Sequence, residues 1–210
     1  IVKGGGHGDF HNIVIAPASA QDMYDFVDWG FELAFKHRNP VVILADGIIG
    51  QMMEKVEMHE MKPRRTAEEI AKVAPWATVG KPAGRERNII TSLSLDADIQ
   101  EKFNRKLKNK YDIIEETEVK FSEYMTEDAE YLFVAFGCSS RICEAVVDEL
   151  RAEGIKAGLL RPITLYPFPV KEIARLSKQV KSMMSIELNL GQMVDDVRLA
   201  VNGACPVGFY

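Results

Sequence analysis

The C-terminal part of the chain alternates short apolar runs with helical segments, and this pattern limits its fold more than any other feature. From Tyr131 onward, the runs YLFVAFG, KAGLLRP, SMMSIEL and VGFY have the length and continuous apolar character of buried strands. Segments with helical spacing separate them, and Gly154 ends the first of these helices. Strands that alternate with helices pair in parallel, with helices on both faces of the sheet. Residues 126–210 are therefore predicted to form a complete, doubly wound α/β domain.

A second α/β unit is predicted near the N-terminus. The runs NIVIAP (12–17) and VVILAD (41–46) have the pattern of buried strands, and apolar side chains recur at helical spacing between them. Ser19 and Asp22 have a spacing like that of a capping box at the start of this helix. A strand, a helix and a strand of this length form a βαβ unit, but two parallel strands are not a stable sheet alone. We expect this unit to be the end of a larger α/β domain.

The middle of the chain is predicted to contain one long helix over 96–125. Its apolar positions follow steps of three, four or seven residues: Ile99, Phe103, Leu107, Tyr111, Ile114, Phe121 and Met125. Its charged residues are basic toward the N-terminal end and acidic toward the C-terminal end. This distribution indicates either a solvated outer face or contact with a partner subunit. The expected division is 1–95 for the α/β part with its loop region, 96–125 for the linking helix, and 126–210 for the second domain.

Composition excludes several classes of function. The 210 residues carry a net charge of −5, so a general nucleic-acid footprint is not expected. The longest apolar runs are strand-sized, and neither a membrane span nor a signal peptide is visible. The three cysteines show no CxxC spacing, which favours a reducing, cytoplasmic setting.

The glycine-rich stretch GGGHGDFHN (4–12) is the first candidate for a binding loop. A dinucleotide-binding glycine motif must follow a strand, whereas this stretch precedes one, so a phosphate cradle is disfavoured. His7, Asp9 and His11 are too few and too loosely spaced for a closed metal site, and no metal is predicted. We expect a loop whose backbone approaches a ligand or a neighbouring subunit, with Gly6, His7 and Asp9 as candidate contacts. A start at Ile1, directly before this loop, is expected for an excised fragment or a processed chain.

Polar residues after the second predicted strand are the next candidates. Ligands of parallel sheets bind beyond the carboxyl ends of the strands, and Asp46 and Gln51 could reach a ligand there. Alternatively, Asp46 caps the turn that follows. The residues alone leave both roles open.

Three turns of the C-terminal domain are predicted to gather at one rim of its sheet. The first contains Ser139 and Ser140, either as part of an anion site at a helix N-terminus or, as we favour, as an N-cap. The second contains Arg161, and the third contains Glu187 and Gln192. No Ser/His/Asp or Cys/His arrangement emerges from spacing.

Six ordered motifs resemble the α subunit of the 2-oxoacid:ferredoxin oxidoreductases, of the 2-oxoisovalerate or 2-oxoglutarate type. The motifs are GGGHGD with IVIAP, NPVVILADG with GQMMEKVE, WATVG with GRERNIITSL, YLFVAFG, GLLRPITLYPFP, and IELNLGQMVDDVRLAVNG. The likeness extends over nearly all 210 residues.

This resemblance implies a thiamine diphosphate enzyme. It implies that residues 1–60 end the pyrimidine-side domain, and that 126–210 form a domain similar to the transketolase C-terminal domain. The carboxylate that activates the cofactor would precede Ile1, so neither catalytic nor cofactor-binding residues can be assigned. Thiamine diphosphate and Mg²⁺ would lie at the interface with a partner subunit, iron–sulfur clusters would lie on partner subunits, and this chain alone would bind none of them.

The implied reaction converts a 2-oxoacid, CoA and oxidised ferredoxin to acyl-CoA, CO₂ and reduced ferredoxin. Expected partners are the β and γ subunits, with a δ subunit as a further candidate, and ferredoxin and CoA through the complex. This chain alone is expected to be inactive. Two alternatives are a β-subunit-like part of a lipoamide-linked 2-oxoacid dehydrogenase and a non-enzymatic α/β interaction module.

Overall fold

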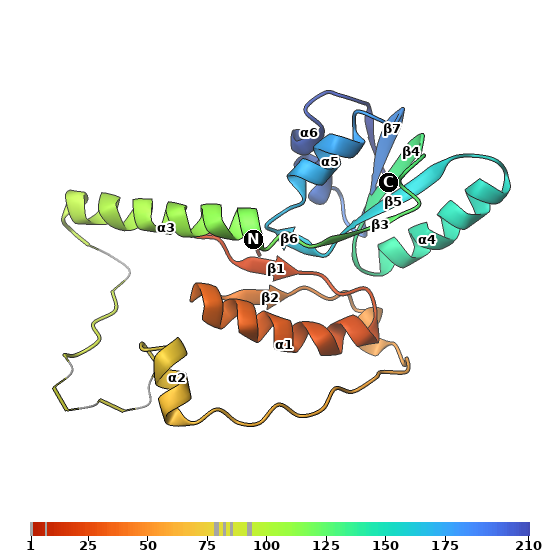
Figure 1. Cartoon of the computed structure of the whole chain (residues 1–210). Helices are drawn as coiled ribbons and strands as arrows, with labels where there is room; N and C mark the ends of the chain where they lie inside the picture. Colours follow the sequence, from red (N-terminus) through yellow and green to blue (C-terminus); the bar gives the residue numbers. More distant parts are fainter. Residues whose placement is uncertain (1, 7, 78–79, 82, 85, 92–93) are drawn as a thin grey trace.

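The structure is a computed structural model that describes residues 2–6, 8–77, 80–81, 83–84, 86–91 and 94–210 (Figure 1). Its strands form one three-stranded sheet, in the order β2-β1-β6, and one five-stranded sheet, in the order β3-β5-β4-β7-β8. Helix α3 extends from this body, as the green helix in Figure 1 shows. The two sheets correspond to the N-terminal and C-terminal α/β units that the sequence predicts.

The first sheet contains the predicted βαβ unit and one strand from the C-terminal half. The elements are β1 (Ile13–Ile15), α1 (Ala20–His37), β2 (Val41–Ile43) and β6 (Thr164–Tyr166). Strands β1 and β2 are parallel, as predicted, and the Ser19 side chain caps α1 by accepting the backbone N–H of Asp22. Strand β6 pairs antiparallel with β1. The first unit therefore obtains its third strand from the second half of the chain.

Helix α3 (Ala97–Thr117) is shorter than the predicted helix, and the prediction that it continues to Met125 was wrong. Strand β3 (Phe121–Tyr124) follows it and pairs antiparallel with β5. The chain leaves the helix where Thr164 bonds to both backbone groups of Lys120. Beyond that point, the aromatic side chains of Phe121 and Tyr124 favour a strand. The pairing of β3 with β5 therefore prevails over the helical spacing of the apolar residues.

The second sheet confirms the predicted doubly wound domain. Its further elements are β4 (Tyr131–Ala135), α4 (Gly137–Ala152), β5 (Ala157–Pro162), α5 (Val170–Leu176), β7 (Ser182–Ile186), α6 (Met193–Val201) and β8 (Val207–Phe209). Strands β5, β4, β7 and β8 are parallel, and β3 adds an antiparallel edge. Apolar side chains of α5 and α6 form one core with the strands, and side chains of α4 form another.

The segment between β2 and α3 contains little regular structure. It includes a short 3₁₀ helix, η1 (Ile49–Gln51), and α2 (Ala67–Val73), whose capping box joins Thr66 and Glu69. An extended stretch between these helices runs beside α1 and bonds to it through Glu54 and Glu57. Among the described residues, no helix is long and apolar enough to cross a membrane.

Candidate functional site

The carboxyl ends of β2, β4 and β7 meet around a small pocket between the two α/β units. It has a volume of about 200 Å³, and its lining includes Asp46 after β2, Ser139 in α4 and Glu187 after β7. The structure thus brings together three of the residues that the sequence singled out. We call this pocket the strand-end junction.

Asp46 acts as a cap in the strand-end junction. Its Oδ1 accepts the backbone N–H groups of Ile48 and Ile49 at 3.0 and 2.9 Å, and its Oδ2 accepts that of Cys138 at 2.9 Å. Burial acts to raise the pKa of this carboxyl, but the amides of Ile49 and Cys138 outweigh it and hold the pKa below its usual value. Of the two roles left open by the sequence, this geometry supports capping.

Gly137 makes the close approach of Asp46 feasible. It begins α4 with φ 61°, and a Cβ placed there would lie 2.9 Å from Asp46 Oδ2. A larger residue would be strained in this left-handed conformation and would crowd the carboxylate. Glycine at this position therefore serves the contact between the two units.

Glu187 performs the same task for α6. Its carboxylate accepts the backbone N–H groups of Gln192, Met193 and Val194 at 2.8–3.1 Å, and Ser185 Oγ also bonds to it. Burial acts to raise the pKa of Glu187, but the amides of Met193, Gln192 and Val194 outweigh it and hold the pKa below its usual value. Gln192 contributes its backbone amide, while the residue as a whole is exposed.

These contacts bear on any anionic ligand, including a cofactor diphosphate. A helix N-terminus binds an anion through free amide groups, but the chain's own carboxylates occupy amides at the starts of α4 and α6. The N-cap of α4 is Phe136, so the predicted capping role of Ser139 or Ser140 was wrong. Both serines are buried in the first turn, and the Ser140 hydroxyl donates to the Gly137 carbonyl at 2.7 Å. The strand-end junction therefore does not fit a diphosphate.

Arg161 does not line the strand-end junction. Its Nη2 bonds to Asp22 Oδ2 at 2.5 Å and to the Ala16 carbonyl at 3.4 Å, so it joins β5 to the first unit. Its Nε is buried without a hydrogen-bond partner among the described residues. Sequence reasoning recognised Asp22 only as part of a helix start, because nothing in the local pattern reveals a partner so distant in the chain.

The glycine-rich loop lies against α3. Asp9 accepts a hydrogen bond from Asn104 at 2.8 Å, and Gly6 has φ 147° beside the ring of Phe10. His7 lies outside the described residues, and Gln51 is exposed in η1. Within the described part of the chain, no group of three or more His, Cys, Asp or Glu side chains could hold a metal ion.

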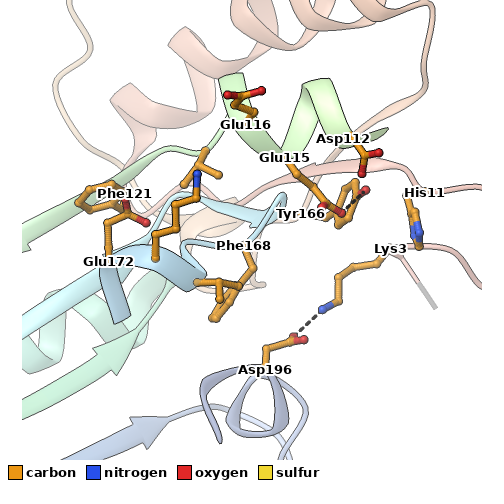
Figure 2. A pocket seen from close by; sticks show the side chains of 13 residues that line it. Lys3, His11, Asp112, Glu115, Glu116, Phe121, Tyr166, Phe168, Glu172 and Asp196 are labelled. Atoms are coloured by element: carbon orange, nitrogen blue, oxygen red, sulfur yellow. Dashed lines mark hydrogen bonds and ion pairs between the residues drawn. The ribbon is translucent and has the colours of Figure 1, made fainter. Parts of the chain in front are cut away.

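Two larger hollows flank α3. One, of about 670 Å³, lies between the glycine-rich loop and α3. The other, of about 800 Å³, lies between α3 and the N-terminal end of α5 (Figure 2). In the latter, the Tyr166 hydroxyl donates to Glu115 at 3.0 Å, and Lys3 forms an ion pair with Asp196. No sequence pattern pointed to this hollow, because its lining comes from separate segments.

Two family models match almost the whole chain. Residues 6–123 match "Pyruvate flavodoxin/ferredoxin oxidoreductase, thiamine diP-bdg", and residues 129–210 match "Pyruvate:ferredoxin oxidoreductase core domain II". The chain belongs to this family. The resemblance carried by the six motifs is thereby confirmed.

Curated relatives are subunits of such enzymes. A ketoisovalerate oxidoreductase subunit VorB from Methanothermobacter marburgensis is 48% identical over 95% of this chain and 55% of its own length. A 2-oxoglutarate synthase subunit KorA from Methanocaldococcus jannaschii is 35% identical over 92% of this chain and 57% of its own length. The chain thus spans little more than half the length of the curated relatives it matches.

A solved structure shows the same fold. The 2-oxoglutarate:ferredoxin oxidoreductase from Magnetococcus marinus, solved with 2-oxoglutarate, coenzyme A and succinyl-CoA bound, superposes with a TM-score of 0.76. The match covers 98% of this chain and 40% of that one at 21% identity. The arrangement of the two α/β units is therefore that of a 2-oxoacid:ferredoxin oxidoreductase.

Proposed function

We propose that this chain works as part of the α subunit of a thiamine-dependent 2-oxoacid:ferredoxin oxidoreductase. The complex would decarboxylate a 2-oxoacid, transfer the acyl group to CoA and pass the electrons to ferredoxin. The observation that carries this proposal is the 48% identity with a ketoisovalerate oxidoreductase subunit over 95% of the chain. The two family matches at 6–123 and 129–210 support the same conclusion.

We infer that the cofactors are held with or by partner subunits. When bound, thiamine diphosphate supplies the carbanion chemistry, and the protein supplies orientation and electrostatics. Thiamine diphosphate and Mg²⁺ would lie at an interface with the β subunit, and iron–sulfur clusters would lie on the β, γ or δ subunits. The amides occupied by Asp46 and Glu187 support this division, because they are not free to bind a diphosphate.

The described residues of this chain would act by positioning. Asp46 and Arg161 each join the first α/β unit to the second, through α4 and β5 respectively. A fixed angle between these units would keep the surfaces that partner subunits contact in register. We propose that the chain divides into residues 1–95, 96–125 and 126–210. In this division the 96–125 segment provides β3 as an edge strand of the sheet in the last domain.

We propose 2-oxoisovalerate as the substrate, with 2-oxoglutarate as the second candidate, and a cytoplasmic location. The order of the two acids follows the identities of the relatives, which are 48% for the ketoisovalerate subunit and 35% for the 2-oxoglutarate subunit.

The test is an anaerobic assay of the complex purified through a tag on this chain. Each 2-oxoacid would be supplied with CoA, and reduction of ferredoxin would be followed by absorbance. We expect reduction that needs CoA and proceeds faster with 2-oxoisovalerate. Acyl transfer to lipoamide without ferredoxin reduction would instead indicate a 2-oxoacid dehydrogenase, and a chain that purifies alone and inactive would favour a non-enzymatic module.

A further inference from the structure

The proposed function does not use the hollow between α3 and α5. Its volume is about 800 Å³, and we call it the acidic groove. The side chains that matter here are Glu115, Glu116, Phe121, Tyr166, Phe168 and Glu172. Figure 2 shows Glu116 on the wall formed by α3 and Glu172 on the wall formed by α5.

Charge in the acidic groove is strongly one-sided. Its lining includes the carboxylates of Asp112, Glu115, Glu116, Glu172 and Asp196, against the two lysines Lys3 and Lys171. Lys3 is already paired with Asp196, and Asp112 is paired with Lys108, so the carboxylates of Glu115, Glu116 and Glu172 carry the excess negative charge. Neither Glu116 nor Glu172 has a hydrogen bond or ion pair with another described side chain, so both remain available to an incoming cation.

The floor of the acidic groove is apolar and aromatic. Phe121 and Phe168 are half-buried, and Tyr166 is buried with its hydroxyl directed to Glu115 at 3.0 Å. Aromatic faces between carboxylates suit a ligand that combines apolar groups with positive charge, because the rings attract cations as well as apolar surface.

The shape and setting of the groove favour a polypeptide as the occupant. Glu115 and Glu116 are exposed, so the groove is open along α3, whereas a small-molecule site encloses most of its ligand. A second copy of this chain is a poor candidate, because it also carries a net charge of −5. A partner segment with apolar residues and several Lys or Arg side chains would complement both the aromatic floor and the carboxylates at the rim of the groove, which are Glu116 and Glu172.

We propose that the acidic groove is a docking site for a basic, amphipathic segment of a partner protein. The walls come from α3 on one side and from α5 and α6 on the other, so a bound segment would contact both halves of the chain. Attraction between its cations and the rim would speed association and make binding sensitive to salt. This inference does not depend on which reaction the complex catalyses.

The experiment uses the full chain and a synthetic amphipathic peptide of leucine and lysine as the probe. A matched peptide with glutamate in place of lysine controls for apolar binding. Calorimetry would measure affinity, and amide chemical shifts would locate the contact. We expect the lysine peptide alone to bind, with shifts at Phe121 and Phe168 and a weaker affinity at about 1 M salt.

Charge-reversed variants make the test specific. The double variant Glu116→Lys/Glu172→Lys should weaken binding about tenfold or more. The double variant Glu127→Lys/Glu153→Lys, at exposed positions away from the groove, should bind like the original chain. Should the first variant melt early, Glu116→Gln/Glu172→Gln takes its place. The proposal is overturned if the lysine peptide does not bind, if both peptides bind equally, or if only the polyamine spermidine binds in the groove.

Discussion

The carboxylate of Asp46 accepts a hydrogen bond at 2.9 Å from the backbone N–H of Cys138, which lies 92 residues further along the chain. This contact connects the end of β2 in the first sheet to the first turn of α4 beside the second. The same carboxylate also caps η1. One side chain therefore satisfies backbone groups of both α/β units.

Asp46→Ala should lower the free energy of unfolding by about 1–3 kcal/mol, because it leaves the backbone N–H groups of two buried residues, Ile49 and Cys138, without their acceptor. Urea unfolding would measure the loss, and Glu127→Ala, at an exposed position, is the matched control. A change no larger than that of the control would show that the contact does not hold the two units together.

The stability contributed by Glu187 should depend on pH. Its carboxyl has a pKa below the usual value of 4.5 in the folded chain, so the unfolded chain binds a proton more readily. The contribution is complete above the unfolded pKa and is lost as pH falls through the folded pKa. Unfolding of the original chain and of Glu187→Gln, compared from neutral to acid pH, should give curves that converge in acid. Parallel curves would contradict this account.

Asp22 and Arg161 should be coupled energetically. Their side chains are only 23% and 14% exposed, so we expect a double-mutant cycle with Asp22→Asn and Arg161→Gln to give about 1–2 kcal/mol. The exposed pair Arg105 and Glu101 on α3 provides the comparison and should show almost no coupling. Equal coupling in the two cycles would mean that burial at the boundary between the units adds nothing.

Strand β3 should decide how well the second domain folds alone. A fragment of residues 118–210 retains β3, whereas 126–210 exposes the edge of β5 that β3 covers. We expect both to unfold cooperatively, with a lower Tm for 126–210. A fragment of residues 1–95 loses β6 from its sheet and should aggregate. A monomeric and cooperatively folded 1–95 fragment would contradict the view that the first unit is incomplete without the rest of the chain.

Much of this fold can be predicted from the local spacing of apolar residues, because buried strands and helices each have a characteristic spacing. The four parallel strands of the second sheet and the βαβ unit of the first are such cases. The end of α3 could not be predicted in this way, because Phe121 also fits the helical spacing of apolar residues. Only its pairing with β5 shows that Phe121 belongs to a strand.

The site was only partly predictable for a related reason. Asp46 and Glu187 follow predicted strands in the sequence, so their location at the carboxyl ends of strands was predicted correctly. That their carboxylates accept the amides of α4 and α6 depends on which helices pack against those strand ends. The pairing of Arg161 with Asp22 and the assembly of the acidic groove depend on contacts between distant segments, which leave no periodic signal in one sequence.

The central proposal is that this chain acts only together with partner subunits. The binding of thiamine diphosphate tests it most directly. Calorimetry would titrate thiamine diphosphate with Mg²⁺ into the chain alone and into the complex purified with it. We expect no binding to the isolated chain above that of a control protein, and clear binding to the complex. Micromolar binding to the isolated chain would contradict the proposal that partner subunits supply the cofactor site.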